Sequence, residues 1–311
     1  MISQQQIAVL IPCYNEEVAI GAVIRGFMAA LPGATVHVYD NNSSDRTIAI
    51  AEEHGAVVHR VPLQGKGNVV RRMFADIEAD AYVLVDGDDT YCAASAPAML
   101  HSLFANQLDM VVARRVTDEA GAYRAGHRFG NWLLTECVAR LFGRSFNDIL
   151  SGYRVFSRRY VKSFPALANG FEIETELTVH ALELRMSVDE IASPYKSRPS
   201  GSHSKLNTYR DGARILLMIV KLFRTERPLM FFGGIAALLA VLATLLALPL
   251  FITYAETGLV PRFPTAVLVT GMGITAALSA ACGLILDTVT RGRQEIKRLV
   301  YLQIAPPRQQ Q

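Results

Sequence analysis

Short apolar runs alternate with amphipathic segments along the first part of the chain. The runs 7–11, 35–39, 56–61, 81–85 and 110–113 have the length and the β-branched content of buried strands. The segments 17–30, 45–54, 66–78 and 94–106, which lie between them, have the pattern of helices. Strands that alternate with helices predict an α/β domain with a doubly wound, mostly parallel sheet.

Two further segments are apolar all round. Residues 229–255 and 263–286 carry no charge over about 27 and about 24 positions, enough to cross a hydrocarbon core of ~30 Å. Only residues 256–262 join them, so the pattern predicts a transmembrane hairpin over 229–287. Five glycines are expected to let the two helices approach closely: Gly233, Gly234, Gly271, Gly273 and Gly283.

The basic residues predict how this hairpin is oriented. They flank both of its outer ends, whereas the joining loop has one acid and one base, so we expect the loop outside and both termini with the α/β domain in the cytoplasm. Residues 206–228 place basic side chains along one arc and apolar ones beside it, which predicts a helix lying on the membrane surface. The predicted organisation is an α/β domain at 1–205, this juxtamembrane helix, the hairpin at 229–287 and a basic tail at 288–311.

The composition predicts a membrane protein whose α/β domain faces the cytoplasm. Hydrophobic residues make up 51% of the 311 residues, and the net charge of only +3 gives no general surface for nucleic acid. The four cysteines are scattered and predict free thiols in a reducing compartment. No segment has the pattern of a signal peptide.

Polar clusters follow three of the predicted strands directly. Pro12–Glu16 follows the first strand, Asp40 the second, and Asp86-Gly87-Asp88 the fourth. The carboxyl ends of parallel strands meet at one edge of a sheet, where open α/β sheets bind ligands. We therefore expect these three clusters to converge on one site.

The two aspartates predict a metal site. Asp86 and Asp88 repel one another unless a cation lies between them, and carboxylate oxygens favour Mg²⁺ or Mn²⁺. Gly87 lets the backbone turn sharply and approach a ligand. A solvated acidic turn is the alternative for this sequence taken alone.

Two basic positions are candidates for binding phosphate. Lys66 lies between Gly65 and Gly67 at a predicted helix start, which favours an anion site, with a flexible loop as the alternative. Arg154 follows a Gly-Tyr pair that is expected to lift it into a cleft, with a surface ion pair as the alternative. No Walker A loop and no GxGxxG motif is present, which argues against a dinucleotide cofactor.

These motifs together resemble a known family. Pro12-x-Tyr14-Asn15-Glu16, the Asp40 cluster, Gly65-Lys66-Gly67 and Asp86-Gly87-Asp88 are similar to the family 2 glycosyltransferases of GT-A fold. Within them the chain most resembles the polyprenyl-phosphate glycosyltransferases, which include dolichyl-phosphate mannose synthase. The resemblance continues through three later segments: Asp148-x-x-Ser151-Gly152-Tyr153-Arg154, residues 171–176, and residues 198–205 with the apolar segments beyond.

The resemblance implies a role for each motif. Pro12, Tyr14, Glu16 and Asp40 would hold the base and ribose of a UDP- or GDP-sugar, and Lys66 would lie beside the donor. Asp86, Gly87 and Asp88 would hold its diphosphate through Mg²⁺ or Mn²⁺. Two positions depart from the family pattern, because Asn41 stands where many relatives have a second Asp, and Thr90 where they have Gln. Either water or Asp89 then remains as a third metal ligand.

The expected reaction is the inverting transfer of the sugar to a polyprenyl phosphate at the cytoplasmic membrane face. Candidate acceptor-phosphate residues are Arg154, Arg198, Ser202 and Lys205, with Arg154 also placed in the catalytic group beside Asp86 and Asp88. The Ala/Leu-rich composition favours a bacterial inner membrane and undecaprenyl phosphate.

Three alternatives stay open. A processive polysaccharide synthase is disfavoured because its Gln/Arg-x-x-Arg-Trp motif is absent. A transferase acting on a lipid hydroxyl such as that of diacylglycerol would need a base, for which Asp148 or Glu174 is the candidate. The third is a non-catalytic membrane scaffold that binds a nucleotide-sugar. The sequence is compatible with a monomer and with a homo-oligomer.

Overall fold

The computed structural model describes residues 5–116, 135, 136, 139, 140, 146–170, 172–199, 217 and 220–307. The chain divides into two compact units, Met1–Ile215 with Lys297–Gln311, and Leu216–Ile296. The first unit therefore includes the end of the chain as well as the predicted α/β domain.

The described part of the first unit contains one seven-stranded sheet in the order β3-β2-β1-β4-β6-β5-β7. Its strands are β1 (Ile7–Cys13), β2 (Thr35–Asp40), β3 (Val57–Arg60), β4 (Ala81–Leu84), β5 (Met110–Val116), β6 (Arg154–Ser157) and β7 (Val188–Pro194). The five predicted strands are confirmed, with ends shifted by a few residues.

Strand β6 is antiparallel to both of its neighbours, whereas the other pairs are parallel. The sequence pattern predicted neither this strand nor β7. The first residue of β6, Arg154, pairs with Leu84 at the end of β4. Because β6 runs in the opposite direction to β4 and β5, it begins at the edge of the sheet where those strands end. The residues just before β6 therefore lie at the carboxyl edge of the parallel strands.

Helices cover both faces of the sheet. The first layer is α1 (Ile20–Ala30), α2 (Thr47–Glu53), the short 3₁₀ helix η1 (Ala93–Ser95) and α4 (Ala96–Ala105). The second layer is α3 (Lys66–Asp76), α6 (Arg158–Ser163) and α7 (Ile173–Glu183). The central strands are apolar on both faces because both are covered: Val9 and Leu10, which point to opposite faces, are each fully buried, as are their neighbours Tyr82 and Val83.

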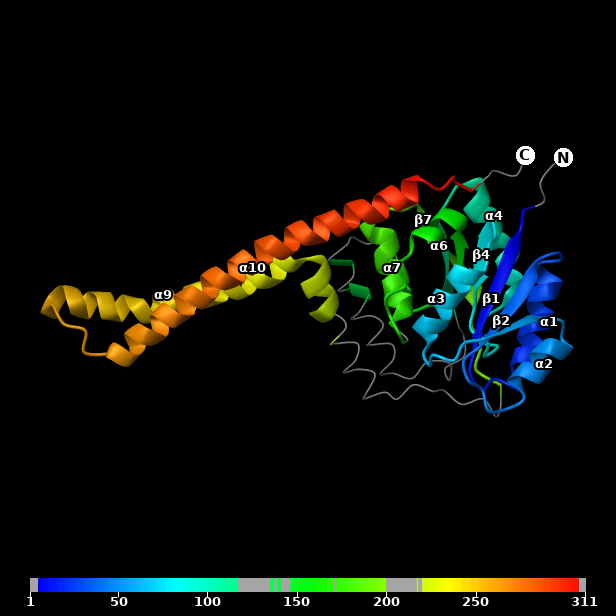
Figure 1. Ribbon diagram of the computed structural model, residues 1–311, viewed down its shortest axis with the longest axis horizontal. Coiled ribbons are helices and arrows are strands. Elements are labelled where there is room, and N and C mark those ends of the chain that lie inside the picture. Colours follow the sequence, from blue (N-terminus) through cyan, green and yellow to red (C-terminus); the bar gives the residue numbers. More distant parts are fainter. Residues whose placement is uncertain are drawn as a thin grey trace. The chain divides into compact units, whose positions relative to one another are not determined.

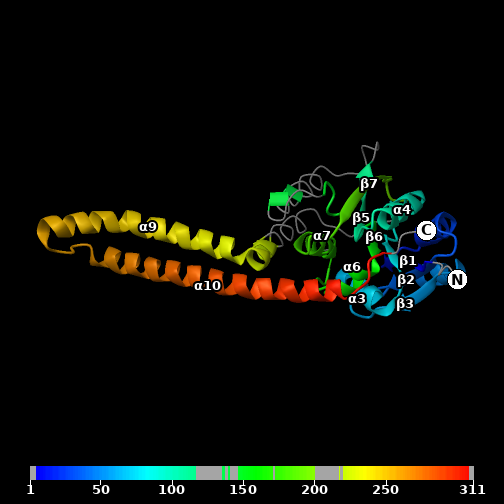
Figure 2. The ribbon, with the colours of Figure 1, turned by 90° about the horizontal axis from the view of Figure 1, so that it is seen from above.

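The second unit is a helical hairpin. Helices α9 (Pro228–Thr257) and α10 (Phe263–Leu302) lie side by side in both views (Figures 1 and 2). Both are long and apolar enough to cross a membrane, and their apolar side chains are largely exposed. The predicted end at residue 286 is not a helix end, because α10 continues to Leu302.

Close approach of the two helices occurs at one of the five glycines. A β-carbon at Gly283 would lie 3.2 Å from the Phe232 side chain, whereas Gly233, Gly234, Gly271 and Gly273 have no such neighbour within 4 Å among the described residues. The expectation is therefore right for Gly283 and wrong for the other four.

Candidate active site

The loops after β1 and β2 are joined by backbone hydrogen bonds to side chains. Asn15 N donates to Ser43 Oγ at 2.8 Å, and Glu16 N donates to Thr47 Oγ1 at 2.8 Å. In return, Ser44 N donates to Asn15 Oδ1 at 2.8 Å. This pairing brings the first two polar clusters together, as the strand order predicts.

Within these loops, Tyr14 is exposed and Asp40 is buried. Tyr14 is 38% exposed, Pro12 is half-buried and Glu16 is buried. Asp40 Oδ2 accepts from Ser43 N at 3.1 Å, whereas its buried Oδ1 has no hydrogen-bond partner in the described part of the chain. A buried carboxylate oxygen without a donor is costly unless a ligand supplies one.

Asn41 holds the loop that leads to α3. Its amide nitrogen donates to the carbonyls of Val61 and Leu63, both at 2.9 Å, and its Oδ1 accepts from Gly65 N at 2.7 Å. An aspartate could not make the two donations. The departure from the family pattern at this position therefore has a structural reason.

The Gly65-Lys66-Gly67 stretch packs against another segment of the chain. A β-carbon at Gly65 would lie 2.2 Å from Asn169 O, and one at Gly67 would lie 2.3 Å from Ala168 O. Gly65 also has a φ of 125°, which only glycine adopts readily. These glycines are thus required by the approach of residues 168–169, which the anion-site hypothesis did not foresee.

Lys66 itself forms ion pairs with two carboxylates. Its Nζ lies 2.5 Å from Asp86 Oδ1 and 2.5 Å from Glu174 Oε1. Burial would lower the pKa of Lys66, but the charges of Asp86 and Glu174 outweigh it and hold the pKa above its usual value. Lys66 therefore stays charged and links α3, the end of β4 and α7.

Asp88 has a different set of partners from Asp86. Its Oδ1 accepts from the Thr90 hydroxyl at 2.6 Å, and its Oδ2 pairs with Arg198 Nη2 at 2.6 Å. Burial, together with the nearby charge of Asp86, raises the pKa of Asp88. A site that disfavours two neighbouring anions favours a cation between them.

The remaining residues of this turn are held by contacts within the protein. A β-carbon at Gly87 would lie 2.7 Å from Cys13 Sγ, so this glycine is required by contact with β1. Asp89 pairs with Lys196 at 2.8 Å.

Arg198 is the acceptor-side candidate that the structure brings to this site. Its side chain is 30% exposed and reaches Asp88 directly, with Glu16 at 3.9 Å. Ser202 and Lys205 lie outside the described residues.

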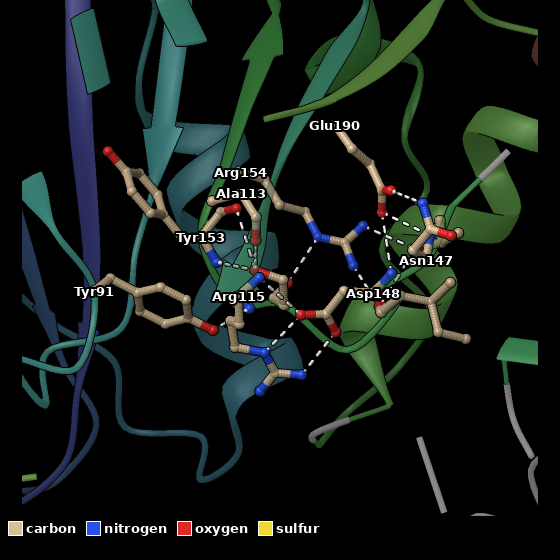
Figure 3. A network of polar contacts seen from close by, with 12 residues as sticks. Tyr91, Ala113, Arg115, Asn147, Asp148, Tyr153, Arg154 and Glu190 are labelled. Carbon is tan, nitrogen blue, oxygen red and sulfur yellow. Dashed lines mark hydrogen bonds and ion pairs between the residues drawn. The ribbon is translucent and has the colours of Figure 1, made fainter. Parts of the chain in front are cut away.

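Arg154 is not in a cleft, which corrects the expectation drawn from the Gly-Tyr pair. It is fully buried, and its guanidinium donates to the carbonyls of Ile149 and Ser151 and to Thr178 Oγ1 (Figure 3). Because Arg154 begins the antiparallel strand β6, its side chain is enclosed by the loop that precedes it. Its guanidinium is used within the protein to hold this loop, and its burial leaves no surface of it open to a phosphate.

Comparisons with known proteins agree with this geometry. The model of the family described as glycosyl transferase family 2 matches residues 8–164. Glycosyltransferase AglJ of Haloferax volcanii is 35% identical over 256 residues, which cover 82% of this chain and 83% of AglJ. The chain belongs to glycosyl transferase family 2.

Other relatives of this family 2 glycosyltransferase extend the comparison. A dolichyl-phosphate hexose transferase of Haloferax volcanii is 29% identical, over 71% of this chain and 95% of that protein. Glucosyl-3-phosphoglycerate synthase from Mycobacterium tuberculosis has a TM-score of 0.59 at 23% identity, over 71% of this chain and 80% of the synthase. Its GT-A-like fold is shared here, and it has been crystallised with UDP together with Mn²⁺ or Mg²⁺.

The oxygen atoms at the site fit such a divalent cation. Asp86 and Asp88 are hard oxygen donors, and Mg²⁺ is commonly held by one or two carboxylates with phosphate oxygens and water completing its shell. Among the described residues, no group of three His, Cys, Asp or Glu side chains gathers around one point. Asp86 and Asp88 would therefore hold the cation together with the donor diphosphate.

Sequence reasoning missed the role of Glu174. It was considered only as a base for a hydroxyl acceptor, yet it is buried, pairs with Lys66 through Oε1, and leaves Oε2 without a partner within the described chain. The sequence has three closely spaced glutamates within 172–176. Of these, Glu174 pairs with Lys66, which lies 108 residues away, so the sequence did not indicate which glutamate belongs to the site.

Proposed function

We propose that this family 2 glycosyltransferase moves a sugar from a nucleoside diphosphate onto a polyprenyl phosphate at the cytoplasmic face of a membrane. The observation that carries the proposal is the contact between Arg198 and Asp88 at 2.6 Å. It joins the expected acceptor segment to the expected donor site on one edge of the sheet.

On the donor side, three features suit a nucleotide-sugar. The unpartnered Asp40 Oδ1 suits an N–H group of a base, and the exposed Tyr14 ring suits stacking on it. Asp86 and Asp88 are positioned for a cation bound to the diphosphate, and that cation would neutralise the charge developing on the leaving group.

On the acceptor side, a phosphate dianion needs positioning more than deprotonation, because its second pKa is about 6. Arg198 can provide a guanidinium for it once a divalent cation has taken its place on Asp88. Attack by the phosphate oxygen on the anomeric carbon would invert that centre. The apolar hairpin and the dolichyl-phosphate relative both support a lipid acceptor whose tail remains in the membrane.

The alternative of a lipid hydroxyl acceptor is less well supported. Such an acceptor needs a general base, and both oxygens of Asp148 accept from the guanidinium of Arg115 at 2.7 Å. Glu174 is paired with Lys66 through one oxygen, Oε1. Each of the two candidate bases is thus already bonded to a cationic side chain of the protein.

The decisive experiment uses the purified full chain in detergent with Mn²⁺, undecaprenyl phosphate and a panel of UDP- and GDP-sugars. We expect one donor to give a glycosyl phospholipid by mass spectrometry. Asp88→Asn should abolish turnover, whereas Asp189→Asn, on the far strand β7, should not. Transfer to diacylglycerol alone would support the alternative, and binding without turnover would indicate a scaffold.

A further inference from the structure

The Asp86 carboxylate lies directly against the backbone of Gly152. A β-carbon at Gly152 would lie 2.3 Å from Asp86 Oδ2, 2.9 Å from Cγ and 3.1 Å from Oδ1. Real β-carbons are not found this close to another heavy atom, so no side chain fits here while Asp86 keeps its orientation.

Gly152 is required here for space alone. Its φ is not among the left-handed values that the structure has at Gly33, Gly55, Gly65 and Gly258. A left-handed backbone is therefore not the reason for a glycine at residue 152. An alanine there would leave no room for the carboxylate of Asp86.

On its other side, Asp86 is held by the ammonium group of Lys66 at 2.5 Å. The carboxylate is thus confined between a buried lysine and a bare stretch of backbone, with its side chain still 28% exposed. This confinement determines the direction in which its oxygens are offered to a ligand.

The backbone at Gly152 is itself held in place. Gly152 N donates to Tyr91 Oη at 2.8 Å, and Ser151 Oγ donates to Ala113 O at 2.7 Å (Figure 3). Arg154 Nε donates to Ser151 O at 2.9 Å and Nη2 to Ile149 O at 2.6 Å.

The start of the same loop is tied to two strands. Arg115 on β5 pairs with both oxygens of Asp148, and Glu190 on β7 accepts from the backbone nitrogens of Asn147 and Asp148 (Figure 3). With bonds to β5, β7 and Tyr91, the loop cannot move aside easily. A methyl group at residue 152 would therefore displace Asp86 and not the loop.

We propose that Gly152 is a positioning residue that fixes the orientation of Asp86 for binding of the metal and donor diphosphate. The buried Arg154 acts through Gly152, because it holds the loop rigid. This inference rests on the proposed function, in that it takes Asp86 as a ligand of that complex.

The test is a double-mutant cycle on the full chain in detergent, with binding of UDP or GDP in the presence of Mn²⁺ measured by calorimetry. Substitutions that disturb the orientation of a metal ligand commonly cost 10- to 100-fold in metal affinity, so Gly152→Ala should weaken binding by roughly tenfold or more. Thermal unfolding without ligand should change less than in Lys66→Met, because Lys66 keeps its pair with Glu174 and the displaced carboxylate is partly exposed.

Gly170→Ala is the matched control. Its β-carbon would lie 2.5 Å from Glu172 Oε2, but Glu172 is exposed and can rotate away. We expect this variant to bind like the unaltered enzyme.

The double variant Asp86→Ala/Gly152→Ala distinguishes positioning from general damage. If Gly152 acts through Asp86, the methyl has space once the carboxylate is gone, and the double variant should fold and bind as Asp86→Ala does. Binding weaker than that of Asp86→Ala, or misfolding of the double variant, would overturn the inference.

Two other outcomes separate this inference from the proposed function. Full binding by Gly152→Ala with loss in Asp86→Ala would overturn the role of Gly152 alone. Full binding by Asp86→Ala, or no binding of either nucleotide by the unaltered enzyme, would overturn the proposed donor site and this inference with it.

Discussion

Arg198 Nη2 lies 2.6 Å from Asp88 Oδ2, although 110 residues separate them in the chain. The guanidinium contacts the carboxylate on which a divalent cation is proposed to bind. Under the proposed function, binding of the metal and donor would release Arg198 for the acceptor phosphate, and this would couple the two substrates through one side chain.

The first prediction concerns this arginine. Arg198→Gln should raise the KM for the lipid phosphate by roughly 10- to 100-fold, because a hydrogen bond to a charged group contributes about 1.5–3 kcal/mol. Binding of Mn²⁺ with the nucleotide should stay unchanged or tighten. Lys196→Gln, which removes only the pair with Asp89, is the control, and an equal effect of both variants would contradict the assignment.

A second prediction tests the ion pairs of Lys66. Lys66→Met leaves Asp86 and Glu174 without their cation and should destabilise the fold by about 3–5 kcal/mol, as expected when one partner of a buried pair is removed. The free energy of unfolding in detergent measures this. Adding Glu174→Gln should recover part of the loss, whereas Arg72→Met, which breaks an exposed pair on α3, should cost at most about 1 kcal/mol. If Lys66→Met and Arg72→Met lowered the free energy of unfolding equally, the stabilising role of the Lys66 ion pairs would be excluded.

The third prediction is a pH dependence from His180, which is buried on α7 and bonded to Ser163 Oγ. Burial, with a contribution from Lys297, lowers the pKa of His180 to about 3. Between pH 6.5 and 3 the unfolded chain binds a proton at this histidine that the folded chain does not, so stability falls as pH falls through this window.

His180→Gln should remove the part of the pH dependence of stability that comes from this histidine. Below pH 6.5 the unfolding free energy of the unaltered protein should fall more steeply than that of the variant, by up to about 1.4 kcal/mol per pH unit. Above pH 7 the difference between the two should be constant. Parallel curves down to pH 4 would show that His180 titrates normally in the folded state.

A fourth prediction concerns the end of α10, which belongs to the first unit. Lys297 Nζ lies 2.8 Å from Glu183, whose side chain is 1% exposed, and Tyr301 Oη donates to the buried Asp109 at 2.9 Å. Lys297→Met should therefore destabilise the first unit by about 3–5 kcal/mol. Arg291→Met, which breaks an exposed pair on the same helix, should cost at most about 1 kcal/mol in the same unfolding measurement. If Lys297→Met and Arg291→Met lower the free energy of unfolding by the same amount, the predicted role of Lys297 is wrong.

The sequence by itself determined five of the seven strands, the helices that lie between them, the apolar hairpin and the three polar clusters that meet at one edge of the sheet. These features are local, because the period of apolar positions reports which face of an element is buried. The convergence of Glu16, Asp40 and Asp88 follows from the parallel order of β1, β2 and β4, which the alternation of strands and helices already implies.

Only the tertiary structure decided which charges are paired. Strand β6 enters antiparallel between β4 and β5, and this turns Arg154 into the interior and brings Gly152 against Asp86. Lys66 bonds with Glu174, and Lys297 with Glu183, across more than a hundred residues. No periodicity reports such partners, because an ion pair depends on where two distant side chains meet once the whole chain has packed.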